Sequence, residues 1–374
     1  MIGCALLLAA LSTASAAEPI ITAEPLPDYE LLFGSTRGWI GADGAFSVPL
    51  GKDRILWLFS DTFVGEVRDG RRVNAVMINN SIAIQRLGPE GGVDYFYSTD
   101  PDGRPASFVT PEDGHGYFWL FAGAAASDGL FIFLPHIEHY EAGGVFPFKT
   151  IGMGLGHVSN PQDPPVRWRI TQRRLPFCRY EEKGSLYFGS AVLHDGGHIY
   201  IYGQDSTRKD SGGNARSATV LARAPADRFG EFSLWRFYSD GEWVTNFTLC
   251  GAVSEGWASE HSVSYVPGVG RYAAVYTAMG ITGVIVARLA DRPEGPWSEP
   301  VKLYECPDRN RRENTYSYAA KAHPELAEEP NELIVTYATN SMHFPDLMED
   351  AEIYLPRFVR VRIDNSKSDQ RRSQ

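Results

Sequence analysis

Residues 38–67 read GWIGADGAFSVPLGKDRILWLFSDTFVGEV, and this stretch decides the fold. It predicts a β-hairpin with a strand near residues 45–50, a polar turn at 51–54 and a second strand at 55–59. Both strands carry apolar residues at successive positions, without the alternation of a half-exposed strand. We therefore expect this hairpin to be buried on both faces.

Two carboxylates flank the predicted hairpin, Asp43 before its first strand and Asp61 after its second. Pairing Leu50 with Ile55 across the turn brings both carboxylates to the same end of the hairpin. In that register the two side chains point to opposite faces. The glycines beside Asp43 permit a non-strand backbone that can re-aim its side chain.

Strands of the same kind, apolar and carrying an aromatic residue near the end, recur about every seventy residues. Their sequences are LWLFSD, LFIFLP, IYIYGQ, AAVYTA and IVTYAT, with the aromatic residues Phe59, Phe133, Tyr202, Tyr276 and Tyr337. Each is preceded by a turn and another short strand, which predicts five hairpins. Self-similarity at a fixed spacing is typical of repeat architectures.

The outer halves of these units also repeat. VLARAPADRFGEFSLWRFY at 220–238 parallels VIVARLADRPEGPWSEPVKLY at 284–304. Four strands in each of five units predict an all-β fold, a five-bladed β-propeller with about four antiparallel strands per blade. A β-sandwich with chance similarity, or two smaller β domains, is the alternative.

The ends of the chain differ in character from the repeats. The first residues, MIGCALLLAALSTASA, form an apolar run that ends in the small-x-small pattern of a signal peptidase site. We expect a signal peptide at 1–16, a secreted or periplasmic protein, and no membrane span after signal removal. A single propeller domain is expected over 17–364, with residues 21–33 closing the ring or wrapping the first blade. Residues 365–374 are expected to be a disordered polar tail.

Two stretches between the repeats, 143–172 and 205–214, read as surface loops because they are rich in Gly, Pro, Asn and other polar residues.

Charge and cysteine content limit the classes of partner and cofactor. The formal net charge is −11, which argues against nucleic acid as a partner because phosphates demand a positive face. Beyond the signal, Cys178, Cys250 and Cys306 fit either one disulfide with a free thiol or three buried thiols. Nothing resembles a structural zinc site, and no metal or cofactor is expected.

Hairpin ends of a propeller gather around one axial pocket, so candidate functional residues are sought there. The candidate catalytic acids are Asp43, Asp61 and Glu260. The candidate substrate-binding residues are Trp119, Ser190, Gln204, His261, His323 and Asn340. Several have a structural alternative: a turn residue for Asp43, an acceptor of backbone amides for Asp61, core side chains for Trp119 and His323, and strand-end caps for Gln204 and Asn340.

Several acids converging on one pocket suit the cleavage of glycosidic bonds. One protonated carboxyl donates to the leaving oxygen, and a second, ionised carboxylate attacks the sugar or activates water. Burial and mutual repulsion push the two pKa values apart and assign the roles. We therefore hypothesise a secreted glycoside hydrolase acting on a polysaccharide or glycoconjugate. A sugar-binding propeller without catalysis and a protein-interaction scaffold are the alternatives.

Five stretches of the chain carry a family resemblance: GADGAFSVPL, LWLFSDTFVG, GSAVLHDGGHIYIYG, SEHSVSYVPGVGRYAAVYTA and DRPEGPWSEP. They resemble the secreted five-bladed propellers grouped as domains of unknown function 4185 and 5005. Some members of that grouping are endo-D-arabinanases, whose proposed catalytic pair is two first-blade aspartates. The resemblance therefore implies an arabinofuranosyl-type substrate, with Asp43 and Asp61 as the pair.

The fold is also similar to propeller glycosidases that cleave arabinofuranosides, xylosides and fructosides. In those enzymes a first-blade aspartate is nucleophile or base and a later glutamate is the acid, which suggests Asp43 and Glu260. The two resemblances agree on Asp43 and disagree on its partner. The chain departs from the second type at 121–124, Phe-Ala-Gly-Ala, where such propellers often carry an acid.

Overall fold

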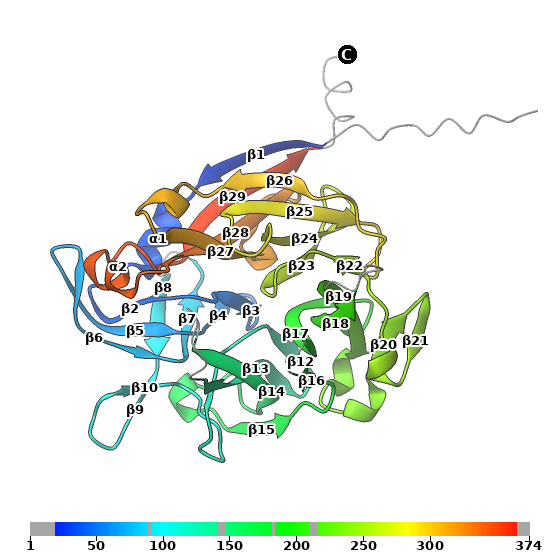
Figure 1. The fold of residues 1–374 in the computed structure, drawn as a ribbon, viewed down its shortest axis with the longest axis horizontal. Coiled ribbons are helices and arrows are strands. Elements are labelled where there is room, and N and C mark those ends of the chain that lie inside the picture. Colours follow the sequence, from blue (N-terminus) through cyan, green and yellow to red (C-terminus); the bar gives the residue numbers. More distant parts are fainter. Residues whose placement is uncertain (1–18, 89–90, 141–146, 182–183, 210–214, 365–374) are drawn as a thin grey trace, which may run out of the picture.

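The structure is a computed structural model that describes residues 19–88, 91–140, 147–181, 184–209 and 215–364. The predicted signal peptide and the predicted polar tail lie outside the described residues. The described chain is dominated by β-sheets that surround a common centre (Figure 1). The all-β class expected from the sequence is confirmed. Within the described part of the chain, no helix has the length and apolar character needed to cross a membrane.

Five of the sheets contain a run of four neighbouring strands. The first run is β3 (Phe46–Pro49), β4 (Arg54–Phe59), β7 (Ser81–Arg86) and β8 (Gly92–Phe96). The second is β12 (Gly123–Ala126), β13 (Gly129–His139), β14 (Phe148–Val158) and β15 (Ile170–Arg174). The third is β17 (Gly184–Asp195), β18 (His198–Lys209), β19 (Ala215–Pro225) and β20 (Arg236–Ser239).

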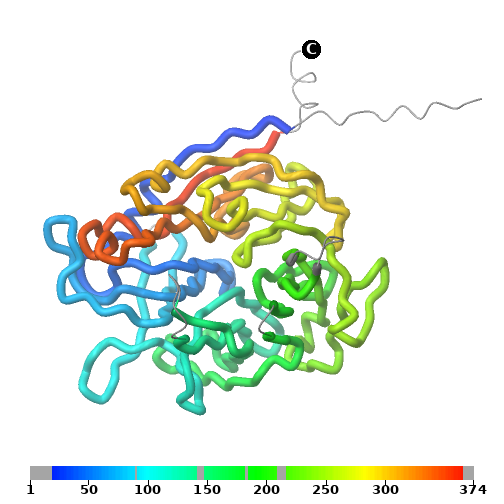
Figure 2. The backbone as a smooth tube through the Cα atoms, viewed as in Figure 1, coloured from blue at the N-terminus to red at the C-terminus, as the bar shows by residue number. Residues whose placement is uncertain are grey.

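The remaining two runs come from the last third of the chain and from its beginning. The fourth is β23 (His261–Val266), β24 (Arg271–Thr277), β25 (Val284–Ala290) and β26 (Val301–Glu305). The fifth is β27 (Thr315–Ala322), β28 (Glu332–Ser341), β29 (Arg357–Asp364) and β1 (Ile20–Pro25). The pairing of β1 with β29 joins the two ends of the described chain in one sheet, as the adjacent blue and red segments in Figure 2 show. Residues 21–25 thus lie where an arm closing the ring was expected.

Shorter elements extend or connect these sheets. The extra strands are β2 (Arg37–Ala42), β5 (Thr62–Arg68), β6 (Arg71–Ile78), β9 (Ser98–Thr99), β10 (Pro105–Ala106), β11 (Tyr117–Phe118), β16 (Arg179–Glu181), β21 (Glu242–Val244) and β22 (Ser254–Glu255). The two α-helices are α1 (Pro27–Phe33) and α2 (Phe344–Glu349). The 3₁₀ turns are η1 (Pro165–Arg167), η2 (Ala226–Arg228), η3 (Phe232–Leu234), η4 (Phe247–Leu249), η5 (Pro307–Asn310) and η6 (Pro324–Leu326).

The five predicted hairpins are confirmed as β3–β4, β12–β13, β17–β18, β23–β24 and β27–β28. Their first strands line one cavity of about 440 Å³, which shows that five distant stretches converge on the centre. The second strands are apolar on both faces because sheets pack on both sides of them. In β4, for example, Leu56, Trp57, Leu58 and Phe59 are all fully buried.

The register of the first hairpin differs from the prediction by one residue. Pro49, not Leu50, faces Ile55, because the Leu50 amide donates to the Arg54 carbonyl and closes a turn one residue shorter than predicted. A shift of one residue reverses which side chains share a face. Continued along the chain, the observed register sets Asp43 against Asp61, whose carbonyl accepts from the Asp43 amide at 3.2 Å.

Both stretches expected to be surface loops contain strand. Residues 148–158 form β14, where Gly154 and Gly156 leave room for the Leu134 side chain of the neighbouring strand. Glycine reads as a loop signal from sequence, but here it serves close packing between strands. Residues 205–209 continue β18, whereas 210–214 and 141–146 lie outside the described residues.

Candidate active site

Asp43 is held at the mouth of the first hairpin by an irregular backbone. Gly44 has φ +85°, and a Cβ atom there would meet the Ser60 amide nitrogen at 3.0 Å. The Ser60 amide donates to the Asp43 carbonyl at 3.2 Å. The expectation that neighbouring glycines re-aim Asp43 is therefore confirmed for the backbone at Gly44.

The Asp43 carboxyl is surrounded by tyrosine hydroxyls and other acids. Its Oδ2 accepts from the Tyr318 hydroxyl at 2.6 Å, and the Tyr354 hydroxyl also bonds to this carboxyl. Its Oδ1 is buried and has no hydrogen-bond donor among the described residues. A carboxylate oxygen in that position is costly, whereas a carboxylic acid can itself donate a proton.

Asp61 lies at the end of β4, on the other side of the same mouth. Its Oδ1 accepts from the Trp119 indole nitrogen at 3.0 Å and from the Asn79 amide at 3.5 Å. Both donors favour the ionised form of this carboxyl. Trp119 was expected to contact substrate, and the structure places it directly against a candidate catalytic acid.

Glu260 immediately precedes β23 and forms an ion pair with a buried lysine. Its Oε1 lies 3.1 Å from Lys321 Nζ, and the Lys321 side chain is only 2% exposed. Glu260 also raises the pKa of Asp43 through its charge, so the three predicted acids come together in one site. We refer to Asp43, Asp61 and Glu260 as the acid cluster.

The electrostatics of the acid cluster separate its members. Burial, followed by the charges of Asp61 and then Glu260, raises the pKa of Asp43 to about 8. Burial raises the pKa of Asp61 to about 6, because it outweighs the hydrogen bonds from Trp119 and Asn79. Of the two carboxyls, Asp43 therefore has the higher pKa and the stronger tendency to be protonated.

Tyr354 reaches Asp43 from a connecting segment, residues 342–356, which we call the strap. Tyr354 has φ +69°, a left-handed conformation that is unfavourable for a bulky residue. Such strain persists only where the surroundings hold it, and it concentrates at functional sites.

Arg72 of β6 binds the backbone of the strap. Its buried guanidinium makes six hydrogen bonds to five carbonyl oxygens, those of Ile40, Leu347, Asp350, Ala351 and Ile353. Gly41 makes room for it, because a Cβ atom there would lie 2.6 Å from Arg72 Nη2 and 2.6 Å from the Tyr354 carbonyl oxygen. The strap backbone is therefore fixed where Tyr354 meets Asp43.

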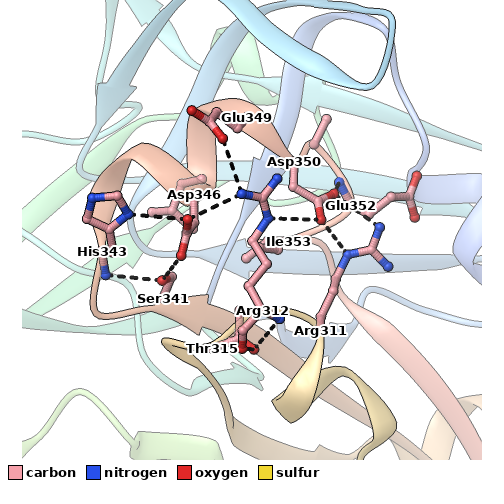
Figure 3. Close-up of polar contacts among 12 residues, drawn as sticks. Arg311, Arg312, Thr315, Ser341, His343, Asp346, Glu349, Asp350, Glu352 and Ile353 are labelled. Atoms are coloured by element: carbon pink, nitrogen blue, oxygen red, sulfur yellow. Dashed lines mark hydrogen bonds and ion pairs between the residues drawn. The ribbon is translucent and has the colours of Figure 1, made fainter.

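Ion pairs also fix the strap (Figure 3). Arg311 contacts Asp350 at 2.6 Å, and Arg312 bridges Asp346 and Glu349 at 3.3 and 3.2 Å. The Ser341 hydroxyl donates to Asp346 at 2.7 Å, which ties helix α2 to the end of β28.

The predicted substrate-binding residues divide into two groups. Trp119, Ser190 and Asn340 lie near the acid cluster: Ser190 is beside Tyr187, whose pKa is raised to about 12 by burial first and then by Glu260. Asn340 pairs across the sheet with Tyr316, whose pKa is raised to about 12 by burial, Asp43 and Glu260.

The other three are buried and bonded to the protein, although His261 Nε2 has no hydrogen-bond partner among the described residues. Gln204 donates to the Ala258 carbonyl at 3.0 Å and accepts from Ser217, so it supports the loop before Glu260. His323 is buried between Ser47 and Thr336, at 2.6 and 2.7 Å. These contacts give Gln204 and His323 supporting roles in the described structure.

His261 is fully buried, and its Nδ1 lies 2.9 Å from the Ala258 carbonyl oxygen. Burial lowers the pKa of His261 to about 4, so this imidazole is neutral at physiological pH. Like Gln204, it contacts the backbone that leads into Glu260.

Several residues of the site escaped prediction. Tyr316 and Tyr318 had a usable signal, because they alternate in the first strand of the fifth hairpin, TYSYAAKA. Asn79 and Tyr354 lie outside the hairpins and had no such signal. Only the fold brings them to Asp61 and Asp43.

The three cysteines beyond the predicted signal, Cys178, Cys250 and Cys306, are all free thiols in the structure. Within the described ranges, no group of three or more His, Cys, Asp or Glu side chains is arranged to hold a metal ion.

A family model described as "Domain of unknown function (DUF5005)" matches residues 27–365. This confirms that half of the stated resemblance, and the relation to domain 4185 and to arabinanases stays a prediction. No curated protein matches the chain.

Among solved structures, the fold is similar to that of a candidate hydrolase from Bacteroides ovatus ATCC 8483, with TM-score 0.72, 19% identity, and coverage of 92% of this chain and 93% of that one. Two further structures have TM-scores below 0.5. A GH43_1 enzyme from Xanthomonas citri complexed with xylotriose has TM-score 0.49 and 14% identity, with 93% and 91% of the chains covered. CoXyl43, a GH43 β-xylosidase/α-arabinofuranosidase from a compost microbial metagenome, has TM-score 0.48 and 15% identity, with 94% and 96% covered. The first of these similarities shows a shared fold.

Proposed function

The chain belongs to the DUF5005 family, and we propose that it is a glycoside hydrolase that cleaves a neutral polysaccharide or glycoconjugate at the acid cluster. The observation that carries this proposal is the convergence of Asp43, Asp61 and Glu260, the first two with pKa values raised by burial. Glycosidic bond cleavage needs such a set: one carboxyl that can donate a proton and another that stays ionised.

We also propose that the five four-stranded runs are the blades of one five-bladed β-propeller. Support comes from the shared central cavity and from the pairing of β1 with β29, which would close the ring. Hydrolysis outside the cytoplasm, after removal of residues 1–16, belongs to the same proposal and rests on the signal pattern in the sequence.

The proposed roles follow from where the proton lies. Asp43 donates a proton to the leaving oxygen, and Asp61 or Glu260 provides the ionised carboxylate that attacks the sugar or activates water. The sequence-based hypothesis gave Asp43 the role of nucleophile or base. We reverse that assignment because burial and two neighbouring carboxylates favour its protonated form.

The charge of the site favours uncharged sugars. Asp43 interacts through charge with both Asp61 and Glu260, and the Lys321 ammonium is already engaged by Glu260. Anionic groups of a substrate would meet repulsion without a free cation in this cluster to offset it. Tyrosine hydroxyls and the Trp119 ring provide surfaces suited to sugar hydroxyls and ring faces.

A panel of polysaccharides tests the proposed function. We expect the purified protein to release shorter sugars from at least one neutral glycan among arabinan, xylan and fructan, with arabinan tested first. Uronate-rich or sulfated algal polysaccharides should be cleaved at least about tenfold more slowly because of charge repulsion. Product sizing by chromatography measures both. Binding to a glycan without any cleavage would favour the sugar-binding alternative and contradict the proposal.

The pH dependence of turnover tests the singly protonated state of Asp43 and Asp61. With pKa values of about 6 for Asp61 and about 8 for Asp43, the singly protonated pair exists mainly between these values. Turnover should therefore be bell-shaped with a maximum near pH 7, because both groups are protonated below the window and both are ionised above it. Initial rates in constant-ionic-strength buffers from pH 4 to 10 provide the measurement. A rate that stays constant across that range would contradict a role for the singly protonated pair.

A further inference from the structure

Lys321 is one of the largest fully buried side chains of the described structure. Its Nζ contacts Glu260 Oε1 at 3.1 Å and the Ala319 carbonyl oxygen at 2.7 Å. It also lies 4.3 Å from the centre of the Phe46 ring, which favours a cation. A buried ammonium is costly, so it depends on its contacts with Glu260, the Ala319 carbonyl and the Phe46 ring to remain charged.

A β-bulge aims Lys321 at the acid cluster. In the β27–β28 pairing, Tyr318 faces Ala338 and Lys321 faces Thr336, so β27 advances three residues where its partner advances two. The extra residue reverses the alternation and puts Lys321 on the same face as Tyr318. Ala319, within the bulge, has φ +58°, a left-handed conformation that costs free energy for a residue other than glycine. Without the bulge, Lys321 would point to the other face of the sheet.

We propose that Lys321 is a positioning residue of the acid cluster: its ammonium fixes Glu260 as the permanent carboxylate, so that the mobile proton is confined to Asp43 and Asp61. This inference rests on the proposed function. It adds to that function a division of labour among the three acids, with Glu260 as the ionised partner in the resting protein.

Among the titratable groups around Lys321, Glu260 has the strongest charge interaction with it. Burial lowers the pKa of Lys321, and the charge and hydrogen bond of Glu260, followed by the charge of Asp43, act in the opposite direction. The charge of Lys321 also acts on His261 and His323. Burial, followed by this charge, lowers the pKa of His323 to about 3, and burial lowers that of His261 to about 4, so both imidazoles are neutral. The charge of Glu260 also reaches Tyr187, Tyr316 and Tyr318, whereas Asp61 and Tyr354 interact with Asp43. The tyrosines remain neutral well above pH 7 because burial raises their pKa values.

Carboxyl titration of Lys321→Met tests the inference without any substrate. The titration of Glu260 is followed in protein with ¹³C-labelled Asp and Glu side chains, in wild type and in the variant. In Lys321→Met its titration should move upward by about one to three pH units, because an opposite charge at this distance shifts a carboxyl by that amount. The matched control is Lys302→Met, which removes an exposed lysine from its ion pair with Glu305 and should leave Glu260 unchanged.

A double variant keeps the test meaningful if Lys321→Met folds poorly. Either Lys321→Met or Glu260→Gln alone leaves one buried charge unpaired, whereas Lys321→Met with Glu260→Gln removes both. We expect the double variant to recover at least half of the loss in melting temperature caused by the single changes. The inference is overturned if Glu260 titrates identically in wild type and Lys321→Met, or if the losses of melting temperature simply add.

The titration separates this inference from the proposed function. A shifted Glu260 in a protein that cleaves no glycan would retain the role of Lys321 and reject hydrolysis. In an active enzyme, Lys321→Met should also move the acidic limb of the rate profile to higher pH, whereas loss of substrate binding alone would raise KM and leave the profile of kcat in place.

Discussion

Asp43→Asn should lower turnover by on the order of 10³-fold or more, because an amide does not act as a proton donor to the leaving oxygen. The fold should be retained, because the amide keeps the shape of the carboxyl. The Tyr318 hydroxyl, now 2.6 Å from Oδ2, can still donate to an amide oxygen at this position. Initial rates on the best glycan of the panel, with circular dichroism to check folding, measure the effect.

The control for this variant is Asp94→Asn, which changes an exposed aspartate in β8 that pairs with Arg86. It should leave turnover unchanged because Asp94 lies in the outer strand of the same sheet. Turnover that survives Asp43→Asn would remove Asp43 from the mechanism.

Asp43→Asn should also alter the dependence of stability on pH. The pKa of Asp43 rises from an ordinary value of 3.8 to about 8 on folding, so its contribution to stability is full below pH 4 and is lost as the pH rises through 8. Asparagine does not titrate, so the melting temperature of the variant should increase relative to wild type between pH 4 and pH 8. A difference that is the same at both ends of this window would show that Asp43 has an ordinary pKa.

Arg72→Ala should be the most destabilising single change outside the acid cluster. It removes a donor from five carbonyl oxygens, of which the Asp350 oxygen keeps the Ile353 amide, and each buried group left unsatisfied costs about 1–3 kcal/mol. Because such losses are not additive, we expect the free energy of unfolding to fall by about 4 kcal/mol or more. Chemical denaturation measures this loss.

The effect on activity should follow from the strap. Without Arg72, the strained backbone at Tyr354 is free to relax, and the Tyr354 hydroxyl leaves Asp43. Arg68→Ala is the matched control, since Arg68 ends the neighbouring strand and is paired only at the surface with Glu66; its cost should stay below about 1 kcal/mol. A similar small cost for Arg72→Ala would show that the strap holds itself in place.

Much of the fold was predictable because its signal is local. The apolar strands that end at Phe59, Phe133 or Tyr202 carry their hairpins in a few residues each, and all these hairpins occur in the structure. The register was not predictable at the same level. One hydrogen bond between Leu50 and Arg54 shortens the turn by one residue and sets Asp61 against Asp43.

The residues of the candidate site also divide into those with a local sequence signal and those without one. Asp43, Asp61 and Glu260 lie at hairpin ends, where the repeat itself identifies them. Tyr354 and Arg72 come from a connection and from an extra hairpin, and their roles depend on long-range contacts that no periodicity records. For His323 the structural alternative, a core histidine, accounts for its contacts, since Ser47 and Thr336 hydrogen-bond to its two ring nitrogens.

The central claim is that the closing of the sheets around one centre makes a single sugar-cleaving site from distant acids. The most direct measurement is a crystal structure of Asp43→Asn with an uncleaved neutral oligosaccharide. We predict the glycosidic oxygen within hydrogen-bond distance of the residue 43 amide, with Asp61 and Glu260 facing the same sugar. A sugar bound instead in the cavity beside Ser47 and His323, or on an outer strand, would contradict the claim.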